Sequence, residues 1–409
     1  MRECPPLSAT PSRRALRGVL SGALATLLGA GLVAPAPATA APPLCGPTGP
    51  DSLTQTPWAL RRLEPSSAWP LSRGAGVTVA VIDSGVSAAH PLLKGQVLDG
   101  RDFNGLTARK GQCDEAGHGT LIAGIIAGRE GTVVPFSGIA PAARILPIRV
   151  LPQLGEVNNP QLPGQVAAAI DWAVDQGADV INLSLTTIPR PELTAAVERA
   201  LANGVVLVAA AGNRKEDSQS LPGYPAAYPG VIAVGGVDEQ GSHVGTSISG
   251  DYVDIAAPGM NIVGPAPGNT GYRTVPEGGT SYAAAYVSGV AALVRAAYPN
   301  LSPQQVADRL KRTADNPPEG QNADIGHGMV NPYRAVSSLL GTRANAPASA
   351  LPAPAVADDP LSWQRPAAIW AAVIGGLLAV LLLVARPIMA LGRRRAWRPG
   401  RRTDAPTAG

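Results

Sequence analysis

Apolar and polar positions alternate through the middle of the chain in a way that predicts strands and helices in turn. Five short, nearly continuous apolar runs are typical of strands covered on both faces; they span residues 77–82, 144–150, 180–185, 205–210 and 231–234. Between them, residues 165–176 and 193–202 carry apolar side chains at helical spacing, and Gly177 and Gly204 end these patterns. Alternating strands and helices form βαβ crossovers. We therefore predict an α/β fold with a doubly wound, mostly parallel sheet and helices on both faces.

The first 40 residues have the pattern of a secretory signal peptide. Arginines precede an apolar run over residues 19–33, and small residues follow up to Ala40. A basic region, an apolar region and a small-residue site in this order predict export and cleavage near Ala40. The alternative is an uncleaved N-terminal membrane anchor. Residues 41–73 then form an N-terminal extension of the mature protein.

An uncharged apolar stretch, residues 367–385, predicts a C-terminal transmembrane helix. At about 1.5 Å per residue it is long enough to cross a hydrocarbon layer of about 30 Å. Trp363 and Trp370 lie near its start, where indole rings favour the membrane interface. The arginine-rich tail, residues 386–409, predicts a cytoplasmic end and an extracytoplasmic globular part. Residues 342–366, rich in Ala and Pro, predict an extended tether.

Basic residues gather at the two ends of the chain. The formal net charge is +4, but residues 386–409 carry seven arginines against one aspartate, and residues 1–17 carry four arginines against one glutamate. The segments contribute +6 and +3, which leaves −5 for the middle of the chain. An acidic globular part gives no support to nucleic-acid binding.

Two cysteines remain after the predicted cleavage. Cys4 lies in the removed segment, and Cys45 and Cys113 lie beyond it. An even pair in an oxidising compartment favours a disulfide that ties the extension to the loop before His118. The alternative is two free thiols.

A glycine and a threonine place Ser281 in the first turn of a predicted helix of small residues. A helix N-terminus supplies unpaired backbone N–H groups and partial positive charge, which suit a nucleophile and a developing oxyanion. The alternative is a serine that only caps the helix.

Two more residues add chemistry at the ends of predicted elements. Asp83 ends the first apolar run, at the edge where a doubly wound sheet places working groups; the alternative is a turn-forming aspartate. His118 lies between two glycines before a predicted helix over residues 121–127, and its alternative is a loop or capping residue. No histidine has metal-ligand spacing to another histidine or a cysteine, so we expect no metal site.

Aspartate, imidazole and serine together form an acyl-transfer triad. Ser281 would attack, His118 would accept its proton, and Asp83 would hold the imidazole tautomer. Asn213, just after the run 205–210, could supply an oxyanion donor; its alternative is an ordinary turn residue. This chemistry needs no cofactor.

Residues 74–340 resemble the subtilisin-like serine proteases. The resemblance rests on short motifs in the expected order: Val-Ile-Asp-Ser-Gly at 81–85, Gly-His-Gly-Thr at 117–120, Ala-Gly-Asn at 211–213 and Gly-Thr-Ser at 279–281. It implies a protease domain over residues 74–341. It also implies that secreted protein or peptide substrates pair with the backbone around Ser184, Leu185 and Gly212.

The order of segments, from signal peptide to basic tail, is similar to that of the mycosins, the membrane-anchored subtilases of type VII secretion systems. This resemblance implies endoproteolysis of exported proteins and association with a type VII membrane complex. A competing hypothesis makes the chain a structural component of such a complex, with proteolysis secondary. A third class, a cell-wall binding module, has no repeat or aromatic cluster to support it.

The chain departs from the subtilisin pattern in three places. Many subtilases bind calcium after the His-bearing helix, but residues 128–135 contain one carboxylate and no asparagine, so we expect no calcium there. Thr186 stands where the family usually has glycine. The extension 41–73 is shorter than a folding propeptide, and we hypothesise that it stays attached and packs on the protease domain.

Overall fold

The structure, a computed structural model, describes residues 45–50, 52–105, 109–131, 135–153, 159–214, 221–268, 271–340, 364–394 and 396–398. The predicted signal peptide, nearly all of the tether and half of the basic tail lie outside these residues. Residues 1–340 and residues 341–409 form two compact units, and each is described by itself.

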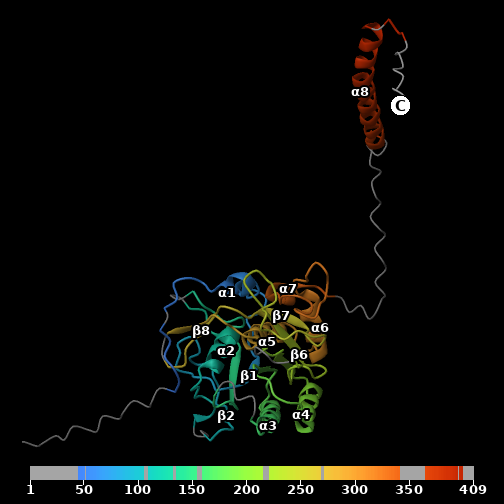
Figure 1. Cartoon of the computed structure of the whole chain (residues 1–409). Helices are drawn as coiled ribbons and strands as arrows, with labels where there is room; N and C mark the ends of the chain where they lie inside the picture. Colours follow the sequence, from blue (N-terminus) through green and yellow to red (C-terminus); the bar gives the residue numbers. More distant parts are fainter. Residues whose placement is uncertain are drawn as a thin grey trace, which may run out of the picture. The chain divides into compact units, whose positions relative to one another are not determined.

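A seven-stranded parallel sheet forms the centre of the first unit (Figure 1). Its strand order is β2-β3-β1-β4-β5-β6-β7, with β1 Thr78–Asp83, β2 Arg101–Asp102, β3 Arg144–Arg149, β4 Val180–Leu183, β5 Val206–Ala210, β6 Ile232–Val237 and β7 Ile255–Pro258. A separate antiparallel pair joins β8, Ile262–Pro265, to β9, Tyr272–Val275.

The strand order reverses at β1, which lies between β3 and β4. In the parallel register Asp83 lies beside Arg149 of β3, and Ile82 lies beside Leu183 of β4. Crevices at such a reversal, beyond the carboxyl ends of the strands, are the usual ligand sites of doubly wound sheets. The fold therefore places Asp83 at the point where a site is expected.

Helices cover both faces of the sheet. Their bounds are α1 Trp58–Leu63, α2 His118–Ala127, α3 Leu162–Asp175, α4 Pro191–Ala202, α5 Thr280–Ala297, α6 Pro303–Thr313 and α7 Pro332–Ser337. Alternate residues of β1 enter different cores: Val79 and Val81 pack with α2 and α5, whereas Ala80 and Ile82 pack with α3 and α4. This two-residue period is that of a strand buried on both faces.

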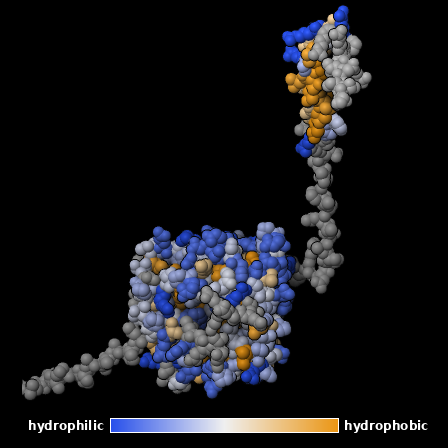
Figure 2. All heavy atoms as spheres, viewed as in Figure 1, coloured by the Kyte–Doolittle hydropathy of each residue, from blue (hydrophilic) through white to orange (hydrophobic). Residues whose placement is uncertain are grey.

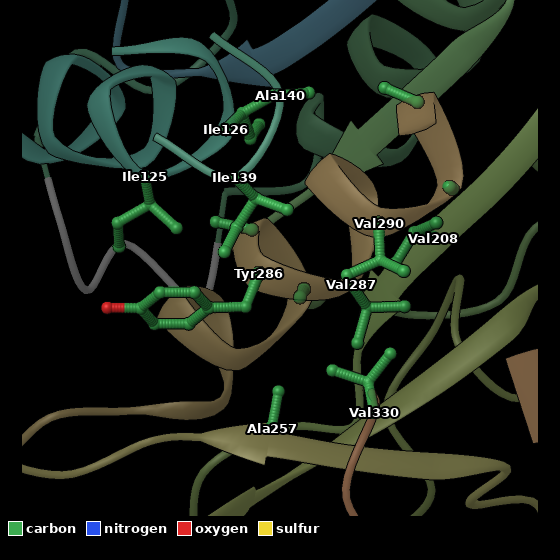
Figure 3. Packing of buried hydrophobic residues seen from close by; sticks show 14 of the residues in the cluster. Ile125, Ile126, Ile139, Ala140, Val208, Ala257, Tyr286, Val287, Val290 and Val330 are labelled. Carbon is green, nitrogen blue, oxygen red and sulfur yellow. The ribbon is translucent and has the colours of Figure 1, made fainter. Parts of the chain in front are cut away.

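The helix α5 is largely buried and contacts α2 and strands β4 to β7. Figure 3 shows its side chains Tyr286, Val287 and Val290 packed among residues of α2 and the sheet. The close approach of α5 to its neighbours depends on small residues, because a Cβ at Gly289 would lie only 2.6 Å from Ile139 Cβ. The alanine-rich sequence thus lets the sheet and α2 surround the helix that begins beside Ser281.

The described part of the N-terminal extension packs on the predicted protease domain. Trp58, Leu60 and Leu63 of α1 are buried in the core with α2 and α5. Cys45 and Cys113 form a disulfide with their Cα atoms 5.0 Å apart, which is the pairing that the sequence favoured.

The second unit contains α8, Gln364–Arg394, a helix of 31 residues. It is long and apolar enough to cross a membrane by length and composition, with a mean hydropathy of 2.7 in its most apolar window. Figure 2 shows hydrophobic side chains along it. The predicted span, residues 367–385, lies within α8, which begins three residues earlier and ends nine residues later.

Candidate active site

Asp83 and His118 form the buried centre of the site. Asp83 ends β1 and has no exposed surface, and His118 begins α2 and is 7% exposed. His118 Nδ1 and Asp83 Oδ1 are 2.7 Å apart. A carboxylate in this position favours the tautomer with its proton on Nδ1, which leaves Nε2 as a base.

Ser84 and Asp114 fix the surroundings of this pair. The Ser84 N–H donates to Asp83 Oδ1 at 2.7 Å, and the Ser84 hydroxyl donates to Asp114 Oδ1 at 2.7 Å. Asp114 also accepts from the backbone N–H groups of Gly117 and Thr120. These bonds hold the N-terminal turn of α2, and with it the His118 ring, over the end of β1.

Ser281 lies in the first turn of α5, after the N-cap residue Gly279. At φ 151° Gly279 has a backbone conformation that L side chains rarely adopt, and a Cβ there would lie 3.2 Å from Asn213 Nδ2. Glycine at position 279 therefore lets the turn that carries Ser281 lie close to the side chain of Asn213.

The Ser281 hydroxyl bonds to the segment that follows β4 and not to the imidazole of His118. Ser281 Oγ donates to the Ser184 carbonyl oxygen at 3.0 Å, and Ser184 Oγ donates back to the Ser281 carbonyl at 2.8 Å. The network extends inward, because Asn182 Nδ2 donates to Ser184 Oγ and Ser288 Oγ donates to Asn182 Oδ1, each at 2.9 Å. This buried chain ties the sheet to two turns of α5.

Asn213 is oriented with its amide nitrogen available. Its Oδ1 accepts from the Thr280 N–H at 3.0 Å and from the Thr280 hydroxyl at 3.2 Å. An oxygen that is occupied by two donors leaves Nδ2 as the free end of the side chain, and Nδ2 can donate to an oxyanion.

One cavity of about 370 Å³ brings the predicted residues together. Its lining includes His118, Ser281 and Asn213, with Ser184, Leu185 and Gly212 beside them. Asp83 lies behind His118 rather than in the wall. Cys113 lies in the loop before α2, and its disulfide attaches Cys45 of the N-terminal extension to that loop.

Electrostatics favour a protonatable imidazole in this cavity. Burial opposes the charged form, but the Asp83 carboxylate, its hydrogen bond and the charge of Asp114 together outweigh this effect, so the pKa of His118 lies above its ordinary value. Burial raises the pKa of Asp114 and also that of Tyr282. The Tyr282 ring packs 5.3 Å from the His118 ring and stays neutral beside it.

Several site residues were not predicted from the sequence. A polar residue inside an apolar strand, Asn182, was a signal that a buried network needed it. Asp114, four residues before His118, was a second such signal. Tyr282 and Glu277 line the cavity, but neither carries a pattern of its own. Among the described residues no group of histidines, cysteines and carboxylates is suited to a metal, and the absence of calcium stays a prediction.

Comparison with known sequences supports this reading of the fold. The model of the subtilase family matches residues 74–328. Mycosin-1 of Mycobacterium tuberculosis is 36% identical over 396 residues, which cover 83% of this chain and 86% of that protein. Subtilisin DY of Bacillus licheniformis is 38% identical over 261 residues, 63% of this chain and 90% of that protein.

Solved structures show the same similarity. The structure of MycP1 with its N-terminal propeptide removed has a TM-score of 0.63 and 33% identity, covering 70% of this chain and 99% of that one. A chain of an intact ESX-5 inner membrane complex has a TM-score of 0.64 and 32% identity, covering 86% of this chain and 94% of that one. The predicted subtilisin-like fold and the resemblance to mycosins are confirmed.

Proposed function

The chain belongs to the subtilase family, and we propose that it is a membrane-anchored serine endopeptidase that uses Asp83, His118 and Ser281 as its catalytic triad. The observation that carries this proposal is the 2.7 Å contact between His118 and the buried Asp83, at a cavity that Ser281 and Asn213 also line. No other described cavity joins a serine, an imidazole and an amide in this way.

Acylation begins with a rotation of the Ser281 side chain. Its hydroxyl leaves the Ser184 carbonyl and turns to His118 Nε2, exchanging one hydrogen bond for another. Ser281 Oγ then bonds to the carbonyl carbon of the substrate while its proton passes to Nε2. Asp83 stabilises the resulting imidazolium.

The tetrahedral oxyanion that forms is held by Asn213 Nδ2 and the Ser281 N–H. Such a donor contributes about 10²- to 10³-fold in rate. The carbon–nitrogen bond breaks as His118 returns its proton to the leaving amine. Water then hydrolyses the acyl-enzyme by the same steps in reverse, with His118 as the base.

Substrate binding is assigned to the strand end that leads from β4. We place an extended peptide along the backbone of Ser184 and Leu185, with Gly212 on the opposite wall, as in strand addition to a sheet edge. Because this recognition uses main-chain groups, it suits protein or peptide substrates.

The proposed setting is the outer side of a membrane. The helix α8 would anchor the chain, and the arginines of residues 386–409 would keep the tail cytoplasmic. Mycosins and the ESX-5 inner membrane complex are among the similar proteins, which supports exported proteins as substrates and association with a type VII secretion complex. The packing of α1 supports an extension that stays attached after export.

Replacement of the nucleophile tests the enzymatic part of this proposal. Ser281→Ala should lower peptide hydrolysis by about 10⁶-fold, the loss found when subtilisin loses its serine, while circular dichroism and the Tm stay close to those of the parent. Glu198→Gln, an exposed change on α4, is the control and should hydrolyse normally. Unchanged turnover by Ser281→Ala would refute the assignment.

A second candidate function is a structural role in the secretion complex. A chain of an intact ESX-5 inner membrane complex aligns with 86% of this chain, and α8 is long and apolar enough to cross a membrane; both observations support a stationary partner in a membrane complex. Secretion in cells that carry Ser281→Ala, compared with cells that lack the chain, separates the roles. Normal export with Ser281→Ala and lost export without the chain would assign the essential role to structure.

A further inference from the structure

Glu277 is a charged residue of the catalytic cavity that the mechanism above does not use. It is exposed and lines the same cavity as His118 and Ser281. Among the residues that the structure describes in that lining, Glu277 is the one carboxylate. A negative charge on the wall of a peptide-binding cavity bears directly on which substrates enter it.

A turn fixes the backbone position of this carboxylate. The Gly278 N–H donates to the Val275 carbonyl at 3.2 Å, which makes Glu277 the third residue of a turn that begins with Val275 and Pro276. The turn is attached on both sides: Asn261 N–H donates to the Pro276 carbonyl at 3.0 Å, and Gly279 N–H donates to the Gly259 carbonyl at 2.7 Å. Glu277 therefore stands four residues before Ser281 on a braced loop.

The position of Glu277 indicates the side of the cleaved bond that it faces. His118 must give its proton to the leaving amine, so the leaving-group half of the substrate lies toward His118. Tyr282 packs against His118. The strand β9, which leads to Glu277, is tied to the loop before His118, because Arg273 Nη1 donates to the Ala116 carbonyl oxygen at 3.1 Å. We assign Leu185 and Gly212, the proposed peptide-binding walls near the oxyanion donor Asn213, to the acyl half. Glu277 thus belongs to the leaving-group side.

The charge of Glu277 is not neutralised by a neighbour. No ion pair to it is formed by any residue that the structure describes. Arg273 is a cation that acts electrostatically on both His118 and Tyr282. Arg273 Nη1 is bonded to the Ala116 carbonyl at 3.1 Å, and Arg273 does not line the cavity.

We propose that Glu277 selects substrates with a lysine or arginine in the first two residues after the cleaved bond. The inference rests on the proposed protease function and adds a substrate class to it. The carboxylate and the basic side chain would form a solvent-exposed ion pair, which changes kcat/KM by about two- to fivefold. Salt should weaken the preference because exposed charges are screened.

Matched peptides test this proposal. A quenched fluorescent peptide is made in three forms that carry Lys, Gln or Glu at the first position after the cleaved bond, and a second set varies the next position. The ratio of kcat/KM for the Lys and Gln forms is measured at low and high salt. The parent protein should favour Lys at one of the two positions, and Glu277→Gln should bring that ratio to one.

Two further variants sharpen the result. Glu277→Lys should reverse the preference toward the Glu peptide, whereas Glu198→Gln, which removes the same charge from α4, should keep the parent ratio. A Lys preference that persists in Glu277→Gln, or no preference in the parent, would overturn the proposal while leaving the protease assignment intact. Failure of the parent to cleave any peptide, with no labelling of Ser281, would instead overturn both.

Discussion

In the proposed mechanism the protonation of His118 sets the acid limit of activity. Burial and Arg273 disfavour the imidazolium, whereas Asp83 and Asp114 together favour it more strongly. The net result is a pKa above the ordinary value of 6.5. Since a general base must be neutral in the free enzyme, kcat/KM should fall on the acid side with an apparent pKa above 6.5.

The measurement is kcat/KM for a neutral peptide between about pH 5 and about pH 10, a range that begins below the ordinary histidine pKa of about 6.5 and extends well above it. Arg273→Gln removes a charge that opposes the imidazolium, so its acid limb should move to higher pH. Lys94→Gln, a change outside the cavity lining, is the control and should keep the parent limb. A parent limb at or below 6.5 would show that burial outweighs Asp83.

Strands β1 and β3 to β6 and helices α3 and α4 follow closely from the hydrophobic pattern, because these strands are covered on both faces and these helices each have one apolar side. Other elements were not predicted from the hydrophobic pattern. The strand β7 is only four residues long, and the β8–β9 pair packs over α2 without a long apolar run. A capping box, Ser302 with Gln305, marks the start of α6 and was a usable signal.

The candidate site likewise contains residues that the sequence predicts and contacts that it does not. Asp83, His118, Ser281 and Asn213 lie at the ends of elements and in short motifs, so the sequence predicts them. The hydrogen bond from Ser281 to Ser184 depends on a side-chain rotamer, which no sequence pattern encodes. The pairing of Ser288 with Asn182 joins residues 106 positions apart and requires the fold itself.

The disulfide joins the N-terminal extension to the loop that leads into α2. Its cysteines are 68 residues apart, and closure of a loop of that length restricts the unfolded chain by an amount worth about 4 kcal/mol in the chain-entropy model. Cys45→Ser with Cys113→Ser should therefore lower the Tm of the mature protein. Reduction of the parent protein is the matched comparison and should lower the Tm by a similar amount. An unchanged Tm in the double variant would contradict a stabilising role for this attachment.

The whole molecule combines two compact units, one built on the parallel sheet and one that contains an apolar helix. Residues 1–340 contain the complete candidate site, and the second unit contains the apolar helix α8. The proposed chemistry needs no residue of the second unit, so the proposed cleavage and the proposed membrane anchoring can be tested separately. All proposals for substrate and mechanism depend on one point, which is that Ser281 is an activated nucleophile.

Labelling with a fluorophosphonate tests that point most directly. The reagent forms a covalent bond to an activated serine, and peptide mass spectrometry identifies the modified residue. We predict one adduct, on Ser281, in the parent protein, with no adduct in Ser281→Ala and strongly reduced labelling in His118→Ala. An adduct on another residue, or labelling that persists in Ser281→Ala, would contradict the proposed active site.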